Sequence, residues 1–236
     1  MKQMCILKTG STYSDIAEKH GDFEDWVEEG LGLPSEVVCV IDVSALGSLP
    51  LPDAVQGVVI TGAHEMVTDD APWMEQVCSW LRTLVDEKVP ILAICYGHQL
   101  LARALGGEVG YNPKGREVGT VTVHCHSRVH DDPLFGVLPD IFPAQSSHVQ
   151  SVLSLPADAV TLASSDFESF HAFRVGEKAW GVQFHPEFTE AVMRCYVDKQ
   201  RDALAEQGLD ADRVVNAVTA SPAGDMLLQF AKLSSE

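Results

Sequence analysis

The sequence lacks the features that mark membrane-spanning, secreted and disulfide-bonded proteins. No apolar run approaches membrane-spanning length, and the start, Met1 to Lys8, has no apolar signal-peptide core. Six cysteines are scattered along 236 residues without a C-x-x-C pair, a pattern typical of reduced thiols. We therefore expect a cytoplasmic protein that binds no membrane.

Basic charge and phosphate-binding loops are also scarce. The chain carries 34 acidic and 16 basic residues, a net charge of −18, which argues against a basic surface for nucleic acid. No glycine pattern of the Walker or dinucleotide type is present, so we expect no nucleotide cofactor. A short histidine-rich stretch, His124-Cys125-His126 with His130, could suggest a metal site. No second cluster supplies further ligands at the usual zinc spacing, so we expect no metal.

The apolar pattern predicts alternating strands and helices in the first half of the chain, the rhythm of a parallel sheet with crossover helices. After Gly107 the pattern predicts shorter strands and then helices. Without repeats or linkers, we expect a single domain over 1–236, with a core of about 1–190 and a C-terminal helical segment of about 190–236. The predicted strands are 4–8, 36–43, 55–61, 90–94, 117–124, 160–164, 170–175 and 179–184, and the predicted helices are 15–29, 73–87, 97–105, 190–207, 210–220 and 223–233.

The last predicted helix is amphipathic. Its apolar residues are Met226, Leu227, Phe230 and Leu233. We expect this face to pack against the domain, and docking to a partner is the alternative.

The strand 90–94 ends at Cys95 and is followed at once by helical spacing. Small residues lie two before and two after the cysteine, Ala93 and Gly97, as in a nucleophile elbow. A helix N-terminus favours the thiolate, and the N–H of Tyr96 would face the oxygen of a tetrahedral intermediate. A buried structural cysteine is the alternative interpretation of Cys95 alone.

A second apolar run, 179–184, ends at His185-Pro186-Glu187. Together with Cys95 it supplies a thiol nucleophile, a base and a carboxylate to orient that base. The two segments therefore predict a cysteine-dependent acyl-transfer enzyme.

These two motifs, Ile94–Gln99 and Gly181–Glu187, resemble those of class I (triad) glutamine amidotransferases. The resemblance covers about residues 54–190 and is closest to stand-alone proteins related to the amidotransferase domain of GMP synthase. It implies an α/β, Rossmann-like or flavodoxin-like three-layer domain with a mostly parallel central sheet. It also implies that Cys95 is the nucleophile, His185 the base and acid, and Glu187 the orienting carboxylate.

The resemblance implies further site residues. Gly62, after the strand 55–61, matches the second oxyanion-hole donor beside Tyr96, and Gln99 matches a residue that contacts glutamine. Ser147 and His148 match a Ser-His-Gly-Asp run that holds the amino-acid end of the substrate, but Val149 and Gln150 replace its Gly and Asp. The loop after Gly62 is also more acidic than is usual for the family.

The loop Tyr111–Glu117 follows the nucleophile helix and offers two more candidates. Arg116 or Glu117 would lie near the substrate in this type of fold. A solvated turn with an ion pair is the alternative.

The resemblance leads us to expect hydrolysis of the γ-amide of glutamine through a Cys95 thioester, with no cofactor. The chain would then need an acceptor or a separate synthetase partner. The alternatives are a hydrolase of γ-glutamyl peptides or conjugates, which the change at Val149-Gln150 slightly favours, and a binding protein that has lost catalysis.

Overall fold

The computed structural model describes residues 2–45, 47–126 and 129–235. Its described strands form a nine-stranded sheet in the order β2-β1-β3-β4-β11-β10-β9-β6-β7 and a separate pair, β5-β8. The strands are β1 (Gln3–Lys8), β2 (Val38–Asp42), β3 (Val55–Ile60), β4 (Ile91–Ile94), β5 (Glu108–Tyr111), β6 (Glu117–Cys125), β7 (Ile141–His148), β8 (Gln150–Ser154), β9 (Ala159–Ser164), β10 (Ala172–Val175) and β11 (Ala179–Val182).

The large sheet has a parallel half and an antiparallel half. From β2 to β11 all neighbouring strands are parallel. From β11 to β7 they are antiparallel. The expected α/β class is thus confirmed, and the sheet is parallel where the predicted crossover helices lie.

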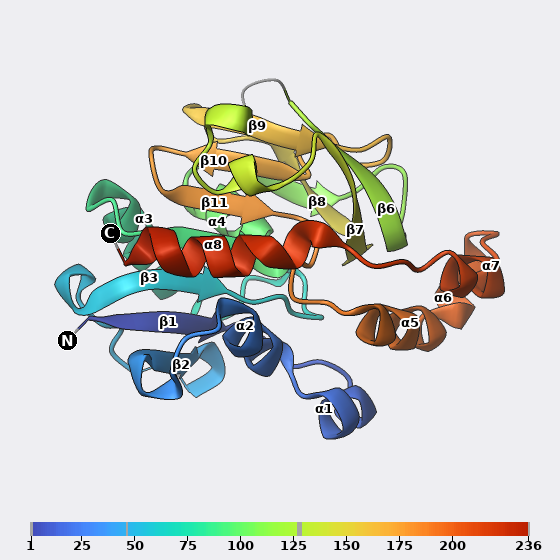
Figure 1. Ribbon diagram of the computed structural model, residues 1–236, viewed down its shortest axis with the longest axis horizontal. Helices are drawn as coiled ribbons and strands as arrows, with labels where there is room; N and C mark the ends of the chain where they lie inside the picture. Colours follow the sequence, from blue (N-terminus) through green and yellow to red (C-terminus); the bar gives the residue numbers. More distant parts are fainter. Residues whose placement is uncertain (1, 46, 127–128, 236) are drawn as a thin grey trace.

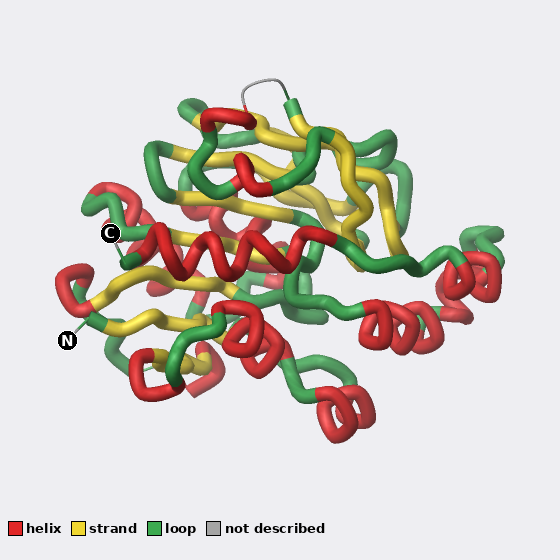
Figure 2. Tube along the Cα trace, viewed as in Figure 1, coloured by secondary structure: helices red, strands yellow, loops and turns green. Residues whose placement is uncertain are grey.

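The helices cover both faces of the parallel half (Figures 1 and 2). α2 and α8 pack together on one face, and α3 and α4 lie on the other. The helices are α1 (Ser14–His20), α2 (Phe23–Leu31), α3 (Met74–Asp86), α4 (Tyr96–Ala104), α5 (Glu190–Lys199), α6 (Arg201–Glu206), α7 (Ala211–Asn216) and α8 (Asp225–Ser234). Within the described ranges, none of these helices has both the length and the hydropathy to cross a membrane.

Alternate side chains of each central strand pack on opposite faces of the sheet. On β4, Leu92 and Ile94 pack in the cluster that includes α2 and α8, whereas Ile91 and Ala93 pack with α3 and α4. All four side chains are fully buried. This continuous apolar run is what a strand covered on both sides requires.

The C-terminal helix packs as the sequence predicts. Met226, Leu227 and Phe230 are buried against α2 and the sheet, and Leu233 packs at the edge of the same cluster. α8 therefore forms part of the domain core.

Two predicted helices are each broken in two. The helix expected over 15–29 breaks at Gly21, whose φ of 85° is unfavourable for other residues, and Asp22 caps α2. The helix expected over 190–207 breaks at Gln200, which ends α5 and precedes α6.

Three strands, β5, β7 and β8, were not predicted. β7 contains Pro143, which lowers its strand propensity, but β7 is the last strand of the sheet, where proline is tolerated. β5 and β8 are short and pair only with each other. Their pairing depends on tertiary contacts and leaves little local signal.

Candidate active site

The ends of three neighbouring strands bring the candidate site residues together. Gly62 follows β3, Cys95 follows β4, and His185 follows β11, and these strands are adjacent in the sheet. The Cys95 N–H donates to the carbonyl of Val182 at 2.8 Å, which ties the two reactive segments together. A site at the carboxyl ends of parallel strands is the usual arrangement in open α/β sheets.

Cys95 lies at a sharp turn between β4 and α4. Its φ of 51° and ψ of −100° are unusual for a residue other than glycine, and such strain concentrates at functional sites. A Cβ at Gly97 would lie 2.8 Å from the carbonyl oxygen of Ile60, so glycine is needed for α4 to start this close to β3. The geometry is that of a nucleophile elbow.

His185 is buried between a carboxylate and an aromatic ring. Its Nδ1 lies 2.7 Å from Oε1 of Glu187, and Phe188 stacks on the ring with centroids 4.0 Å apart. Burial alone would lower the pKa of His185, but Glu187 and the hydrogen-bonded Cys95 outweigh it and raise the pKa to about 10. The arrangement favours an imidazolium facing the sulfur.

Gly62 is held in place by buried threonines and faces the ring of His185. Thr9 Oγ1 donates to the carbonyl oxygens of Thr61 at 3.0 Å and of Gly62 at 3.1 Å. A Cβ at Gly62 would lie 3.0 Å from Cε1 of His185, so any larger residue crowds the ring. Tyr96, the first residue of α4, has an N–H without an intrahelical partner by its position.

Residues 147–150 form one wall beside Cys95. The sulfur of Cys95 lies 3.8 Å from the carbonyl oxygen of Ser147, whose hydroxyl accepts a hydrogen bond from Gln200. Both ring nitrogens of His148 are occupied, Nδ1 by the carbonyl of Gln150 at 2.9 Å and Nε2 by Glu117 at 3.0 Å. His148 therefore contacts the pocket through its ring and not through a free nitrogen.

Two glutamines extend this wall. Gln99 donates its amide hydrogens to the carbonyl of Gln150 at 2.8 Å and to Gln183 at 3.0 Å. Gln150 donates to Thr68, and within the described part of the chain its buried Oε1 has no hydrogen-bond partner. Buried polar atoms without a partner are uncommon, so this acceptor calls for an explanation.

These residues surround a pocket of about 220 Å³. Arg116 lines it beside Gln200, to which it donates at 2.7 Å, and its buried Nε has no hydrogen-bond partner among the residues that the structure describes. Glu117 lies behind the wall instead. The lining residues are Tyr13, Phe23, Ala63, His64, Glu65, Met66, Cys95, Tyr96, Gln99, Arg116, Ser147, His148, Val149, Gln150, His185, Tyr196 and Gln200.

Several lining residues could not be recognised from the sequence. Tyr13 directly precedes α1, Phe23 begins α2, and Tyr196 and Gln200 come from α5 and its end. Aromatic residues at helical spacing indicate core packing in a sequence. Only the fold brings these residues to the pocket.

The expected absence of a metal site concerns His124-Cys125-His126 and His130. Over the described residues, no group of three or more His, Cys, Asp or Glu is arranged to hold a metal ion. The side chain of His130 lies outside the described part of the chain.

The comparisons with known proteins agree with this geometry. The model of the family "Glutamine amidotransferase class-I" matches residues 35–198. γ-Glutamyl peptidase 3 of Arabidopsis thaliana is 30% identical over 176 residues, which cover 72% of this chain and 70% of the relative. GMP synthase of Aeropyrum pernix is 36% identical over 157 residues, covering 66% of this chain and 28% of the relative.

Two other relatives are each matched over more than half of their length. The match spans 59% of γ-glutamyl peptidase 5 of Arabidopsis thaliana at 32% identity, with 62% of this chain covered. It spans 76% of one subunit of the glutamine-hydrolysing GMP synthase of Methanococcus vannielii at 28% identity, with 66% of this chain covered.

Solved structures share the fold. A glutamine amidotransferase from Thermotoga maritima superposes with a TM-score of 0.75 at 19% identity and covers 100% of this chain and 99% of its own. One from Methylobacillus flagellatus gives a TM-score of 0.72 at 21% identity, covering 98% and 92%.

Proposed function

Because this chain belongs to the class-I glutamine amidotransferase family, we propose that it hydrolyses the γ-amide bond of glutamine or of a related γ-glutamyl compound. The observation that carries the proposal is the buried His185, paired with Glu187 and facing Cys95 at adjacent strand ends. An imidazolium beside a sulfur favours the thiolate, which is the attacking species.

In the first step the Cys95 thiolate attacks the γ-carbonyl carbon of the substrate. The N–H groups of Gly62 and Tyr96 stabilise the resulting oxyanion, and donors of this kind contribute about 3–4 kcal/mol each. Glu187 holds the ring of His185 in one tautomer and orientation throughout.

The tetrahedral intermediate then collapses. His185 gives its proton to the leaving nitrogen, the carbon–nitrogen bond breaks, and a γ-glutamyl thioester of Cys95 remains. Neutral His185 next takes a proton from water, whose oxygen attacks the thioester carbon. Glutamate leaves, and the thiolate–imidazolium pair returns.

Polar side chains of the pocket suit the two charges of an amino-acid end. The amide of Gln150 offers an acceptor for an α-ammonium group, and the guanidinium of Arg116 offers donors for an α-carboxylate. Ser147 lies on the same wall, and Gln99 has its Oε1 left for the substrate because its amide hydrogens are used in the protein.

A second candidate substrate, a γ-glutamyl peptide or conjugate, is favoured by the opposite side of the pocket. Tyr13, His64 and Tyr196 form an aromatic cluster with ring centroids 4.3–5.8 Å apart. Phe188 contacts both Tyr196 and His185, so this cluster lies on the side where the leaving amine is protonated. Such a surface suits a leaving group larger than ammonia.

Glutamine as the substrate would imply an acceptor for ammonia. Two relatives, from Methanococcus vannielii and Methanococcus aeolicus, are each named as one subunit of a glutamine-hydrolysing GMP synthase, which supports a search for a separate synthetase partner. All six cysteines are free thiols, which supports a reducing compartment, and we propose the cytoplasm.

Labelling and turnover test the proposal together. We expect a glutamine-like electrophile to modify Cys95 in the wild type and in a Cys125→Ala control, and Cys95→Ala to fold but to lose labelling and glutamate release. Comparing glutamine with γ-glutamyl dipeptides identifies the substrate, and an affinity pull-down tests for a synthetase. Undiminished hydrolysis by Cys95→Ala would refute the mechanism, and absence of labelling in the wild type would favour a binding protein.

A further inference from the structure

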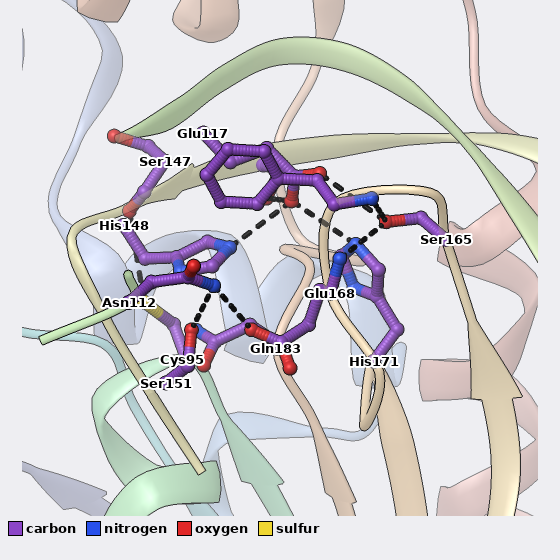
Figure 3. A network of polar contacts seen from close by, with 12 residues as sticks. Cys95, Asn112, Glu117, Ser147, His148, Ser151, Ser165, Glu168, His171 and Gln183 are labelled. Carbon is purple, nitrogen blue, oxygen red and sulfur yellow. Dashed lines mark hydrogen bonds and ion pairs between the residues drawn. The ribbon is translucent and has the colours of Figure 1, made fainter. Parts of the chain in front are cut away.

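A buried carboxylate lies behind the pocket wall. Glu117 is the first residue of β6, is 6% exposed, and stands directly opposite His148 in the β6–β7 register. Its Oε2 lies 3.0 Å from Nε2 of His148, 3.0 Å from Nε2 of His171 and 2.9 Å from the hydroxyl of Ser146. Figure 3 shows Glu117 between the two histidines.

This carboxylate is ionised in the folded protein. Burial alone would raise the pKa of Glu117, but His148 and His171 lower it well below its usual range. An isolated charge at this depth is unfavourable, so a positive partner is required.

The hydrogen bonds of His148 identify that partner. The carbonyl oxygen of Gln150 can only accept, so Nδ1 of His148 donates to it. The ionised Glu117 also only accepts, so Nε2 of His148 donates as well. A ring that donates from both nitrogens is an imidazolium.

The charged pair is connected to the reactive sulfur through one short segment. The carbonyl oxygen of Gln150 accepts from His148 at 2.9 Å and from Gln99 of the nucleophile helix at 2.8 Å. Three residues earlier, the carbonyl of Ser147 lies 3.8 Å from the sulfur of Cys95. The segment 147–150 is thus held from β6 on one side and from α4 on the other.

We propose that Glu117 is a positioning residue, which holds His148 as a doubly donating imidazolium and thereby fixes residues 147–150 for substrate binding. The proposal rests on the proposed γ-glutamyl hydrolysis. Glu117 itself lies outside the pocket lining and acts through His148.

Glu117→Gln tests the proposal, because it keeps the size of the side chain and removes the charge. We expect KM to rise by roughly tenfold, the effect of one weakened charged hydrogen bond, with a much smaller change in kcat. Labelling of Cys95 by iodoacetamide should keep its rate, whereas labelling by the glutamine-like electrophile should slow. Nitrogen-15 NMR should show both ring nitrogens of His148 protonated at neutral pH in the wild type only.

Asp132→Asn is the matched control. Asp132 is 4% exposed and accepts from Arg174 at 2.9 Å and Trp180 at 3.0 Å, on another part of the sheet. This variant should lose stability and keep KM and the His148 spectrum. The proposal is overturned if Glu117→Gln keeps both the KM and the His148 spectrum of the wild type. It is also overturned if Glu117→Gln and Asp132→Asn raise KM equally. Absence of turnover in the wild type would count against the proposed function alone, because the nitrogen-15 spectrum of His148 still tests the Glu117–His148 pair.

Discussion

At the scale of single residues, the site depends on backbone positions that leave no space for a larger side chain. Cys95 occupies a positive φ of 51°, and Gly62 and Gly97 lie where a side chain would strike His185 and Ile60. The motif residues Cys95, His185 and Glu187 could be selected from the sequence because they lie in two short motifs at the ends of apolar runs. Arg116 could be named as a candidate because its loop follows the nucleophile helix. Gln200 and Tyr196 could not, since their place at the pocket depends on tertiary packing.

Substitution of Gly62 tests this constraint. In Gly62→Ala the new methyl group would lie 3.0 Å from Cε1 of His185 and 3.4 Å from Phe23, so the ring must shift. The ring then has to give by a few tenths of an ångström. Because a misplacement of about 1 Å costs on the order of 10²-fold in rate, we expect a several-fold loss in kcat/KM for glutamate release. Gly47→Ala, whose Cβ meets no atom within 4 Å, serves as the control and should match the wild type. Equal rates for both variants would contradict the prediction.

At the scale of elements, α2 is the helix that supports His185 from outside the sheet. Phe23, its first residue, lies over His185 with nearly parallel rings and centroids 6.3 Å apart. Asp22 fixes this end of α2 by accepting from the N–H groups of Phe23 at 2.8 Å and Thr12 at 2.7 Å. Lys8, at the end of β1, donates to the same carboxylate.

Removal of the cap should therefore affect both stability and catalysis. We expect Asp22→Ala to lower the free energy of unfolding by about 1–2 kcal/mol, and to reduce kcat/KM several-fold because Phe23 loosens. Asp210 caps α7 by accepting from the N–H of Asp212 at 3.0 Å. Asp210→Ala should therefore lower the free energy of unfolding and leave kcat/KM unchanged. Urea unfolding and glutamate release measure the two effects. Unchanged kcat/KM in Asp22→Ala would show that α2 does not support the site.

The elements also show where sequence patterns stop being informative. Apolar periodicity located the strands of the parallel half and the long helices, because burial on both faces leaves a strong signal. It did not reveal the break at Gly21–Asp22, which depends on a cap, or the edge strand β7, whose Pro143 is acceptable only at an edge.

At the scale of the whole molecule, the expected α/β class is correct, and the antiparallel direction and the order of the strands from β11 to β7 are what the sequence left unspecified. Glu117 begins β6 and His171 directly precedes β10, and the fully buried His98 of α4 packs against Phe173 of β10. Burial lowers the pKa of His98 to about 3, so this ring stays neutral in the folded protein at neutral pH.

Acid should therefore destabilise the molecule. Between about pH 6.5 and 3 the unfolded chain protonates His98 and the folded chain does not, so stability falls as pH falls. At pH 5 the contribution of His98 to this loss is about 2 kcal/mol. Urea unfolding at pH 7 and 5 should show a loss in the wild type and in a His126→Gln control that exceeds the loss in His98→Gln by about that amount. Equal losses in all three proteins would contradict the prediction.

The hydrogen bond from Cys95 to Val182 fixes the spacing of the two reactive segments independently of the rest of the pocket. The spacing of Cys95 and His185 is set by two paired strands, whereas Tyr13, His64 and Tyr196 belong to loops and to α5. Substitutions at these rim positions can select a new leaving group while the bond-breaking geometry stays as it is. Substrate preference and chemical competence are therefore separable traits, open to independent engineering.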